Sequence, residues 1–576
     1  MALWLHTAGA WCTTYYVAPN GNNANPGSID QPWATPGYGS KQLQPGDTLI
    51  IRGGRYVLSQ FYDDMVTPPS GAVSQWITIR GEDGQRPILA GRDNLFGAIY
   101  LSGLSYIRIE NLEITHDDQT TGRRLYFRDG LDFVDAPCSS IILKDLYIHH
   151  LDEFGINVQD VQNMQIINCQ IEYCGFGAVG GPAGSQGGWR NVSIQGCSLS
   201  YSGHYYQGGD GSNRPYDRPD GFGIEPSVGP IEIVDTIAKH NYGDGLDSKA
   251  SNTTIRRCIV ANNSCDGVKL WGGGSLVENT LIYGRGDGNP TTTPWAAVVI
   301  DSNQANDSFS LINVTVDDFL GNNYLAYVQY DLPVPINLTI RNSIFCGMGT
   351  NSPIWIRDNV QLTADHNLFY LPDNDIVLIH GDNIYTQNNI GTLGEGNLYG
   401  DLLFIAPAWG ENGDYHLQSG SPAIDTGSST DAPNDDLQGF ARDVQPDIGA
   451  YEYSSSNSTM TTSSTTTTTT VTTTSTSTTT FVCQCRANSL NGCISGTVTN
   501  LENQPLIEKV VKLKRTSPIR PKISKGTKTE GNGCYRFVNL PYGTYEIWVR
   551  GCPGGDTKTI VLSSGEKVND TNFQCE

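Results

Sequence analysis

Three short segments in the middle of the chain carry residue types that could do chemistry. The dipeptides Asp220-Gly, Asp244-Gly and Asp266-Gly recur at spacings of 24 and 22 residues. A second position lies three residues further on in each segment and is occupied by Gly223, Asp247 and Lys269. If one period is one coil of a stacked β structure, the two positions form two columns whose members are about 4.8 Å apart. Several carboxylates and one amine would then converge.

Carboxylates stacked this closely repel one another and raise one another's pKa unless a cation lies between them. Ca²⁺ takes six to eight oxygen ligands, so Asp220, Asp244 and Asp247 with carbonyls and water would form a plausible cage. Lys269 would lie one coil from Asp247. A bound cation would also favour the neutral amine, which is the form that a general base needs.

The same dipeptides have a purely structural interpretation. Asp-Gly is a common turn sequence, and repeated Asp-Gly corners in a solenoid can simply mark its turns. Three corners in register, together with Asp247 and Lys269 in the next column, favour a functional site over turns alone.

The elements that would position these residues are short strands recurring about once per period. Each has two or three alternating apolar positions, a turn residue and a further apolar pair, as in Ile141–Ile148, Met164–Ile171 and Leu276–Ile282. Such a unit cannot bury its apolar face alone, so neighbouring units must stack. Equivalent positions hold three cysteines, for which we expect buried thiols rather than a reactive cluster: Cys169, Cys197 and Cys258.

Composition agrees with a repeat of strands and turns. The chain has 576 residues with 65 glycines and only 16% charged residues, and few stretches show helical periodicity. No run of eighteen apolar residues is present, so we expect no membrane-spanning segment. The sequence therefore predicts an all-β protein whose main part is a right-handed parallel β-helix.

The charge balance excludes one class of partner and suggests another. A formal net charge of −23 argues against nucleic acid, which demands a basic surface, and suits hard cations. Residues 481–576 differ from the rest, with 13 Lys and Arg against 8 Asp and Glu. We expect this tail to be a separate unit.

Four segments are predicted along the chain. Residues 1–14 form a truncated or atypical signal segment, 15–453 the β-helix, 454–480 a Ser/Thr-rich linker and 481–576 a Cys-rich module. Six cysteines near the C-terminus predict disulfides and export, with a zinc site as the weaker alternative. Eight Asn-x-Ser/Thr sequons would be usable surface sites if the host glycosylates the chain.

The tail alternates strands with Gly-containing turns, which predicts a small antiparallel β-sandwich. Its pattern of Gly496-Thr-Val, Asn532-Gly-Cys-Tyr-Arg-Phe and Leu540-Pro-Tyr-Gly-Thr-Tyr resembles carboxypeptidase regulatory-like or collagen-binding-B-like modules. The positive charge balance of the module suggests attachment to a surface or an acidic glycan, and a spacer role is the alternative.

The Asp-rich segments also resemble a known family. Pro219-Asp-Gly-Phe222, Gly243-Asp-Gly-Leu-Asp247 and Asp266-Gly-Val-Lys-Leu270 are similar, in order, to the motifs of family 9 of the polysaccharide lyases. These are calcium-dependent pectate lyases with a right-handed β-helix. The entry from Tyr15 to Tyr56 resembles the family's N-terminal cap, and Gly420–Tyr453 resembles a general C-terminal signature of exported β-helix proteins.

The resemblance implies Ca²⁺ ligands at Asp220, Asp244 and Asp247 and a catalytic base at Lys269. The family's first Asp of its Asp-Asp pair is Gly243 here, so Asp266 or water would have to complete the cage. The coil between Asp247 and Lys269 is also shorter than the family's. The implied reaction is β-elimination on an acidic, uronate-containing polysaccharide by a secreted or cell-surface protein, which we expect to be a monomer.

Other functions stay open from the sequence alone. A non-catalytic β-helix that binds glycans, a uronate epimerase and a glycoside hydrolase would use the same scaffold, the last with Asp pairs. His149-His150 with Asp152 and Glu153 could ligate a metal. Adjacent strand residues point to opposite faces, however, so we expect these two histidines to be separated.

Overall fold

The computed structural model describes residues 12–118, 125–285, 296–318, 324–329, 332–347, 353–407 and 413–453, and most of 492–575. In the tail the described residues exclude 501–503, 508, 518–523, 530–533, 541–542, 551, 553–556, 563–566 and 569–570. The chain divides into two compact units, one within residues 1–456 and one within 457–576. The predicted linker, 454–480, lies outside the described residues. The predicted domain boundaries stay a prediction.

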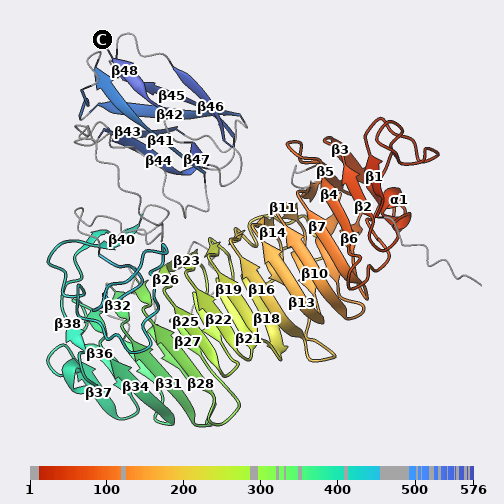
Figure 1. Ribbon diagram of the computed structural model, residues 1–576. Coiled ribbons are helices and arrows are strands. Elements are labelled where there is room, and N and C mark those ends of the chain that lie inside the picture. The colour runs from red at the N-terminus through yellow and green to blue at the C-terminus, as the bar shows by residue number, and fades with distance from the viewer. Residues whose placement is uncertain are drawn as a thin grey trace, which may run out of the picture. The chain divides into compact units, whose positions relative to one another are not determined.

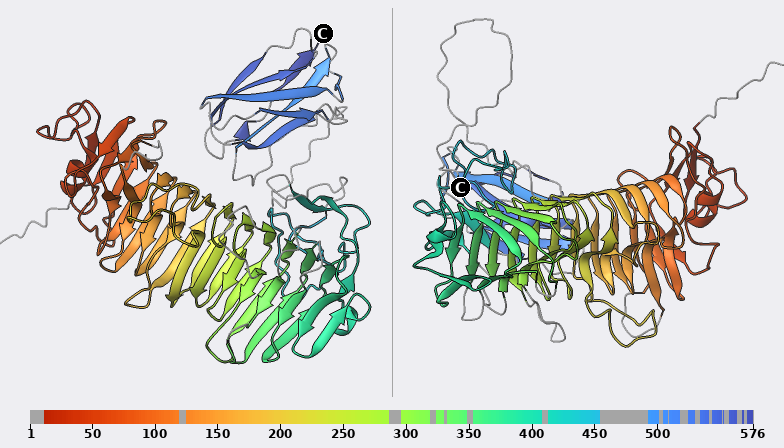
Figure 2. Two further views of the ribbon diagram at one scale, coloured as in Figure 1. Left: turned by 180° about the vertical axis from the view of Figure 1, so that it is seen from behind. Right: turned by 90° about the horizontal axis from the view of Figure 1, so that it is seen from below.

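The first unit is the β-helix expected from the repeat, built from three long sheets that run along its length (Figure 1). From β4 to β36 each coil contributes one strand to each sheet, and neighbouring strands are parallel throughout the stack, apart from the closing pair β36/β37. Figure 2 shows the same stack of coils from behind and from below.

Sheet A contains β1 (Thr14–Val17), β2 (Thr48–Ile51), β4 (Ile77–Gly81), β7 (Ser105–Glu110), β10 (Cys138–Lys144), β13 (Val161–Ile167), β16 (Trp189–Gln195), β19 (Ile231–Val234), β22 (Thr253–Arg256), β25 (Ser275–Glu278), β28 (Ser308–Ile312), β31 (Ile336–Arg341) and β34 (Val360–Asp365).

Sheet B contains β3 (Arg55–Leu58), β5 (Ile88–Gly91), β8 (Glu113–His116), β11 (Tyr147–Leu151), β14 (Gln170–Cys174), β17 (Ser198–Ser200), β20 (Ile237–Lys239), β23 (Ile259–Asn263), β26 (Leu281–Arg285), β29 (Thr315–Asp318), β32 (Ile344–Gly347), β35 (Leu368–Tyr370) and β38 (Leu398–Tyr399).

Sheet C contains β6 (Leu95–Tyr100), β9 (Phe127–Phe133), β12 (Phe154–Val158), β15 (Gly177–Gly180), β18 (Asp220–Ser227), β21 (Leu246–Ala250), β24 (Val268–Leu270), β27 (Ala296–Ile300), β30 (Tyr324–Val328), β33 (Ile354–Ile356), β36 (Ile376–His380) and β37 (Asn383–Thr386).

The core is a set of aliphatic columns inside the coils. In sheet A one column places Leu143 on Ile109, Ile166 on Leu143 and Ile194 on Ile166, and it continues through successive strands. These side chains have no exposed surface. Because each apolar residue is covered by its counterpart one coil above and below, no coil buries its face without its neighbours.

One residue with positive φ makes the corner between sheets A and B in each coil. Asn168, Asn279 and Asn313 hold φ values of 52°, 45° and 52° there. Asn tolerates the left-handed conformation better than most residues, which explains the turn residue in the repeat. Asn313 is fully buried and Asn262 is 1% exposed. The prediction that their sequons are usable surface sites is therefore wrong.

The expected buried thiols follow directly after this corner. Cys169, Cys197 and Cys258 are free, buried cysteines, and the hydroxyl of Thr236 accepts the backbone N–H of Cys197 in the coil between the last two. Burial raises the pKa of Cys258 to about 12. These thiols are inert core groups rather than nucleophiles.

The two ends of the β-helix are covered differently. Near the N-terminus α1 (Pro36–Lys41) packs on β1 and β2, with Thr35 as its N-cap. Near the other end η1 (Ile390–Thr392) precedes β39 (Phe404–Ala406) and β40 (Asp414–Leu417). This last segment packs on sheet B, where Tyr415 and Ile448 share a core cluster with Leu281.

The second unit contains two small sheets, which are mainly antiparallel. The first has β41 (Gly492–Asn500), β44 (Cys534–Leu540), β47 (Lys567–Val568) and β48 (Phe573–Cys575), and the second has β42 (Val510–Ser517), β43 (Ser524–Lys528), β45 (Gly543–Val549) and β46 (Lys558–Leu562). A disulfide joins Cys552 to Cys575, and Cys534 is also disulfide-bonded. Within the described residues of both units, no helix is long and apolar enough to span a membrane.

Candidate functional site

The two predicted columns exist on sheet C, where three consecutive strands β18, β21 and β24 carry them (Figure 1). Gly223 pairs with Asp247, and Asp247 pairs with Lys269. The spacing of 24 and 22 residues therefore corresponds to one coil, as expected. Asp220 is the first residue of β18, while Asp244 and Asp266 lie just before β21 and β24.

Each Asp of the first column supports the corner of the next coil. An Oδ1 atom of Asp220 accepts the backbone N–H of Asp244 at 2.6 Å, and Oδ1 of Asp244 accepts that of Asp266 at 2.8 Å. Oδ1 of Asp266 continues the ladder to the backbone N–H of Ala296 at 3.0 Å. These Asp residues therefore do stabilise the turns. Each uses its Oδ1 atom for this hydrogen bond, and its Oδ2 atom remains available to bind a cation or an amine.

The glycine that follows each Asp has a steric reason. A Cβ on Gly245 would lie 2.8 Å from the carbonyl oxygen of Gly267, and one on Gly267 would lie 2.6 Å from that of Ala297. The coils approach too closely at this corner for a side chain. The fold therefore requires the Asp-Gly dipeptide at this corner. It does not require the second carboxylate oxygen of the Asp, because the hydrogen bond to the next coil uses Oδ1.

Lys269 lies among the carboxylates. Its Nζ atom is 3.1 Å from Oδ2 of Asp244, 3.7 Å from Oδ2 of Asp247 and 4.0 Å from Oδ2 of Asp266. The lysine is only 6% exposed. Burial lowers its pKa, but the carboxylates of Asp244, Asp247 and Asp266 outweigh burial and raise the pKa above the ordinary value. The neutral amine expected from the sequence is not favoured by these protein groups alone.

A cation-sized arrangement of oxygens lies beside the lysine. Asp220, Asp244 and Asp247 each offer an oxygen within 4.8 Å of the others, which is the one such group in the described part of the chain. Oδ1 of Asp247 is buried and has no hydrogen-bond partner among the described residues. Burial, opposed by Lys269 and Lys249, raises the pKa of Asp247 to about 6. A divalent cation would satisfy this oxygen and relieve the repulsion, so the residues fit such an ion.

Asp266 is not part of this group of three. Its Oδ1 is engaged by Ala296, and its Oδ2 lies at the far limit of an ion pair with Lys269. The proposal that Asp266 replaces the missing ligand therefore gains no geometric support here. Its position suits a role beside the lysine.

Gly243 has no room for the carboxylate that the resemblance places there. A Cβ at this position would lie 2.2 Å from Oδ1 of Asp220 and 2.6 Å from the carbonyl carbon of Arg218. Gly223 matters in a related way, because a Cβ there would lie 2.4 Å from Oδ2 of Asp220. The two glycines leave space for the Asp220 carboxylate in its observed position.

Two charged residues beside the site were missed by the sequence reasoning. Lys249 donates to Glu225 at 3.0 Å and lies 3.6 Å from Oδ2 of Asp247. Both are two residues further along their strands than the second column, so alternation along a strand would have placed them on the same face. The register between β18 and β21 shifts between Ile224 and Ser227, so the pairing of Glu225 with Lys249 cannot be read from the residue spacing.

The separation expected for His149 and His150 is wrong. Their Nδ1 atoms are 2.7 Å apart, because His150 has a φ of 56° and leaves the strand geometry. Asp152 and Glu153 are engaged elsewhere: Asp152 accepts the backbone N–H of Phe127, and Glu153 pairs with Arg128. Burial lowers the pKa of His150 to about 3, and the pair belongs to a stack of rings on the outside of sheet B.

Comparison with known proteins agrees with this architecture. Residues 15–276 match a family model described as Pel9A-like, right handed beta helix region. This range includes the whole Asp/Lys site. No curated protein sequence matches the chain.

Among solved structures, XylC in complex with xylose superposes with a TM-score of 0.50 at 11% identity, covering 76% of this chain and 98% of that one. Pectate lyase Pel9A gives 0.42 at 14% identity, covering 77% and 98%. A GH136 lacto-N-biosidase from Eubacterium ramulus gives 0.35 at 16% identity, covering 64% and 68%. At 11% identity, the XylC superposition supports the β-helix fold and not the reaction.

Proposed function

We propose that this protein cleaves an acidic, uronate-containing polysaccharide of the pectate kind by β-elimination, with Lys269 as the base and Ca²⁺ as cofactor. The observation that carries the proposal is the enclosure of one buried lysine by carboxylates of the two columns, beside a group of three Asp oxygens within 4.8 Å. The family match over residues 15–276 supports it further.

The metal would be held by Asp220, Asp244 and Asp247. When bound, Ca²⁺ supplies positive charge that neutralises the sugar carboxylate and so acidifies the hydrogen at C5. Backbone carbonyls or water would complete the coordination, because Gly243 contributes no side chain.

The chain's own groups perform the proton transfer. Lys269 Nζ, in the neutral form that a bound cation would favour, takes the C5 proton, the bond between C4 and the leaving glycosyl oxygen breaks, and a C4–C5 double bond forms. The leaving oxygen takes a proton from water. Asp244 orients the amine through its 3.1 Å hydrogen bond, and the carboxylate of Asp266 lies 4.0 Å from the amine.

The direct test follows polygalacturonate by the ultraviolet absorbance of the unsaturated uronate product. The wild-type protein should produce this signal with added Ca²⁺, and both a chelator and Lys269→Ala should abolish it. Activity that survives both changes would refute the assignment. Thermal unfolding of Lys269→Ala checks that loss of signal is not loss of fold.

Three other functions on the same scaffold are separated by one screen. A glycoside hydrolase releases reducing ends without ultraviolet absorbance, an epimerase changes uronate stereochemistry without cleavage, and a non-catalytic glycan-binding protein does neither. The screen therefore tests pectic, alginate and neutral polysaccharides for new reducing ends and for ultraviolet absorbance. Absorbance that rises with pectic substrates and with no other polysaccharide supports the lyase.

We further propose that the protein acts outside the cell, as a secreted or surface protein, and that it works as a monomer. The disulfide between Cys552 and Cys575 suits an oxidising compartment. The basic second unit would attach the enzyme to a surface or an acidic glycan, because its excess of Lys and Arg attracts negative charge.

A further inference from the structure

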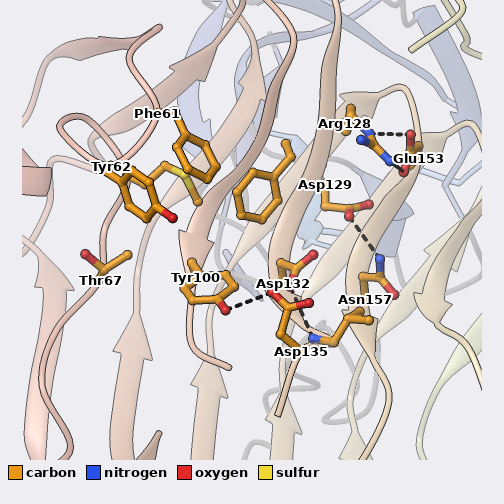
Figure 3. A pocket seen from close by; sticks show the side chains of 13 residues that line it. Phe61, Tyr62, Thr67, Tyr100, Arg128, Asp129, Asp132, Asp135, Glu153 and Asn157 are labelled. Atoms are coloured by element: carbon orange, nitrogen blue, oxygen red, sulfur yellow. Dashed lines mark hydrogen bonds and ion pairs between the residues drawn. The ribbon is translucent and has the colours of Figure 1, made fainter. Parts of the chain in front are cut away.

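A pocket lies on sheet C near its N-terminal end, away from the Asp/Lys site. Its cavity of about 450 Å³ is bounded by β6, β9 and β12 and by the segment from Phe61 to Thr67 (Figure 3). The pocket is lined by Asp129 and Asp132, the first and last residues of the tetrapeptide Asp129-Gly-Leu-Asp132, which has the same four residue types as Asp244–Asp247. The two tetrapeptides occupy equivalent positions on β9 and β21. The register aligns Asp132 with Asp247 through Asn157, Gly180 and Gly223 on the intervening strands β12, β15 and β18.

One wall of the pocket is aromatic. Phe61 contacts Tyr62 and Phe96, with ring centroids 4.0 and 5.2 Å apart, and Phe96 contacts Tyr100 at 5.7 Å. Phe61 and Tyr62 are 48% and 68% exposed. Rings left open to solvent at the mouth of a cavity are available to cover an apolar face of a ligand.

The opposite wall is polar and has unused hydrogen-bonding capacity. Asp132 is only 7% exposed, and its Oδ1 accepts the backbone N–H of Val134 at 3.1 Å. Its Oδ2 lines the pocket without a hydrogen bond from the described residues. Oδ1 of Asn157 is likewise buried without a partner, while its Nδ2 donates to Asp129 at 2.9 Å. The carboxylate of Asp132 therefore has an acceptor atom to spare, and Oδ1 of Asn157 is a buried acceptor without a donor among the described residues.

The charges select against two ligand classes. Four carboxylates line the pocket, and its only cationic lining group, Arg128, already makes a two-pronged pair with Glu153 at 2.5 and 3.0 Å. A uronate would meet uncompensated negative charge there. A bare cation is also disfavoured, because these oxygens do not converge as those of Asp220, Asp244 and Asp247 do in the described chain.

We infer that this pocket binds an uncharged sugar unit, whose apolar face stacks on the Phe61–Tyr100 rings and whose hydroxyls donate to the carboxylate of Asp132. Sugar rings combine one apolar face with hydroxyl donors at their edge, which matches the two walls. The pocket lies four coils from the Asp/Lys site, about 19 Å at ~4.8 Å per coil, so a polysaccharide lying along sheet C could reach both.

The inference does not depend on the reaction proposed for Lys269, and its test keeps the two apart. Binding is measured by calorimetry on the full chain carrying Lys269→Ala, so that no substrate is consumed. The probes are neutral oligosaccharides of xylose, arabinose, galactose, glucose and mannose, with oligogalacturonate as the acidic comparison.

At least one neutral oligosaccharide should bind at millimolar concentration or below. Phe61→Ala and Asp132→Ala should each weaken that binding tenfold or more, whereas Val73→Ala, which trims an exposed apolar side chain outside the pocket, should not. Phe61→Ala removes an exposed side chain, so it tests the site without threatening the fold. Absence of neutral-sugar binding, or binding unaffected by Phe61→Ala and Asp132→Ala, would overturn the inference.

Discussion

Two regions of sheet C share the tetrapeptide Asp-Gly-Leu-Asp and differ in what surrounds it. At residues 244–247 the next coil supplies Lys269 opposite the second Asp, whereas at residues 129–132 it supplies Asn157 opposite Asp132. The first Asp has the same task in both places, accepting the backbone N–H of the following coil at 2.8 Å. The corner is thus a fixed part of the fold, and the neighbouring coil determines the chemistry.

The covering segments differ as well. The pocket at Asp132 is covered by Phe61 and Tyr62, which come from a segment about 70 residues earlier in the sequence. The site at Asp247 is instead flanked by the ion pair of Lys249 and Glu225. If both proposals hold, a repeated backbone carries a cation and a base at one position and an uncharged sugar at another.

Exchanging the residues opposite the second Asp should give the largest effect. Lys269→Asn removes the base and should lower the rate of polygalacturonate cleavage by about 10²–10⁴-fold, the usual contribution of general-base catalysis. Asn157→Lys, the reciprocal change at the other tetrapeptide, should lower that rate far less, because Asn157 lines the proposed sugar pocket and lies four coils from the reacting atoms. Initial rates by ultraviolet absorbance measure both. Equal losses in the two variants would mean that the sites do not differ as described.

Asp132 should make the folded protein less stable as the pH rises. Burial raises its pKa from 3.8 to about 6, opposed by Arg128 and reinforced by Asp135 and Glu153. Because the folded pKa is the higher one, the stabilising contribution is complete below about pH 3.8 and is lost between pH 3.8 and 6. Asp132→Asn should therefore stabilise the protein at pH 8 by up to roughly 3 kcal/mol and have little effect at pH 4.

The measurement is chemical denaturation of the β-helix at both pH values. Asp358→Asn is the control, because the side chain of Asp358 is 81% exposed and folding does not bury its carboxylate. A stabilisation by Asp132→Asn that is equal at pH 4 and pH 8 would contradict the assignment of the raised pKa.

Calcium should stabilise the folded chain through one of the two tetrapeptides only. A site that exists in the folded state raises stability by about 2.7 kcal/mol when the ion is at 100 times its dissociation constant. Asp244→Asn should reduce this shift, while Asp129→Asn should not. Thermal unfolding across a calcium series gives the result, and an identical shift in both variants would remove the proposed cage.

Gly243→Ala should give the smallest change. The added Cβ would lie 2.2 Å from Oδ1 of Asp220, so the carboxylate must move, at a cost of about 1–3 kcal/mol in stability. Calcium binding should weaken with it. Gly97→Ala in the other region is the control, because its Cβ would have no contact closer than 3.7 Å. Improved calcium binding in Gly243→Ala would show that the corner is more adaptable than described.

The sequence predicts the coil register because backbone pairing and side-chain position are tied together in a β-helix. Spacings of 22 and 24 residues were enough to align Asp247 with Lys269. The corner residue, the buried cysteines and the glycines follow from the same periodicity.

Features that depend on contacts across long separations could not be read from the repeat. The contact of His149 with His150 requires a left-handed residue inside an apparent strand, and the Glu225–Lys249 pair follows a register shift. The pocket at Asp132 needs rings from an earlier segment with no periodic relation to it. The charge state of Lys269 depends on three carboxylates whose distances no spacing provides.

The central claim, elimination by the Asp/Lys site, is tested most directly by comparing two products of one reaction. Polygalacturonate is treated with the wild-type protein and Ca²⁺, and new unsaturated ends, from ultraviolet absorbance, are compared with new reducing ends. Elimination predicts equal numbers of both, and neither in Lys269→Asn. Reducing ends without matching absorbance would mean hydrolysis, and would contradict the role of Lys269 as the base that removes the C5 proton.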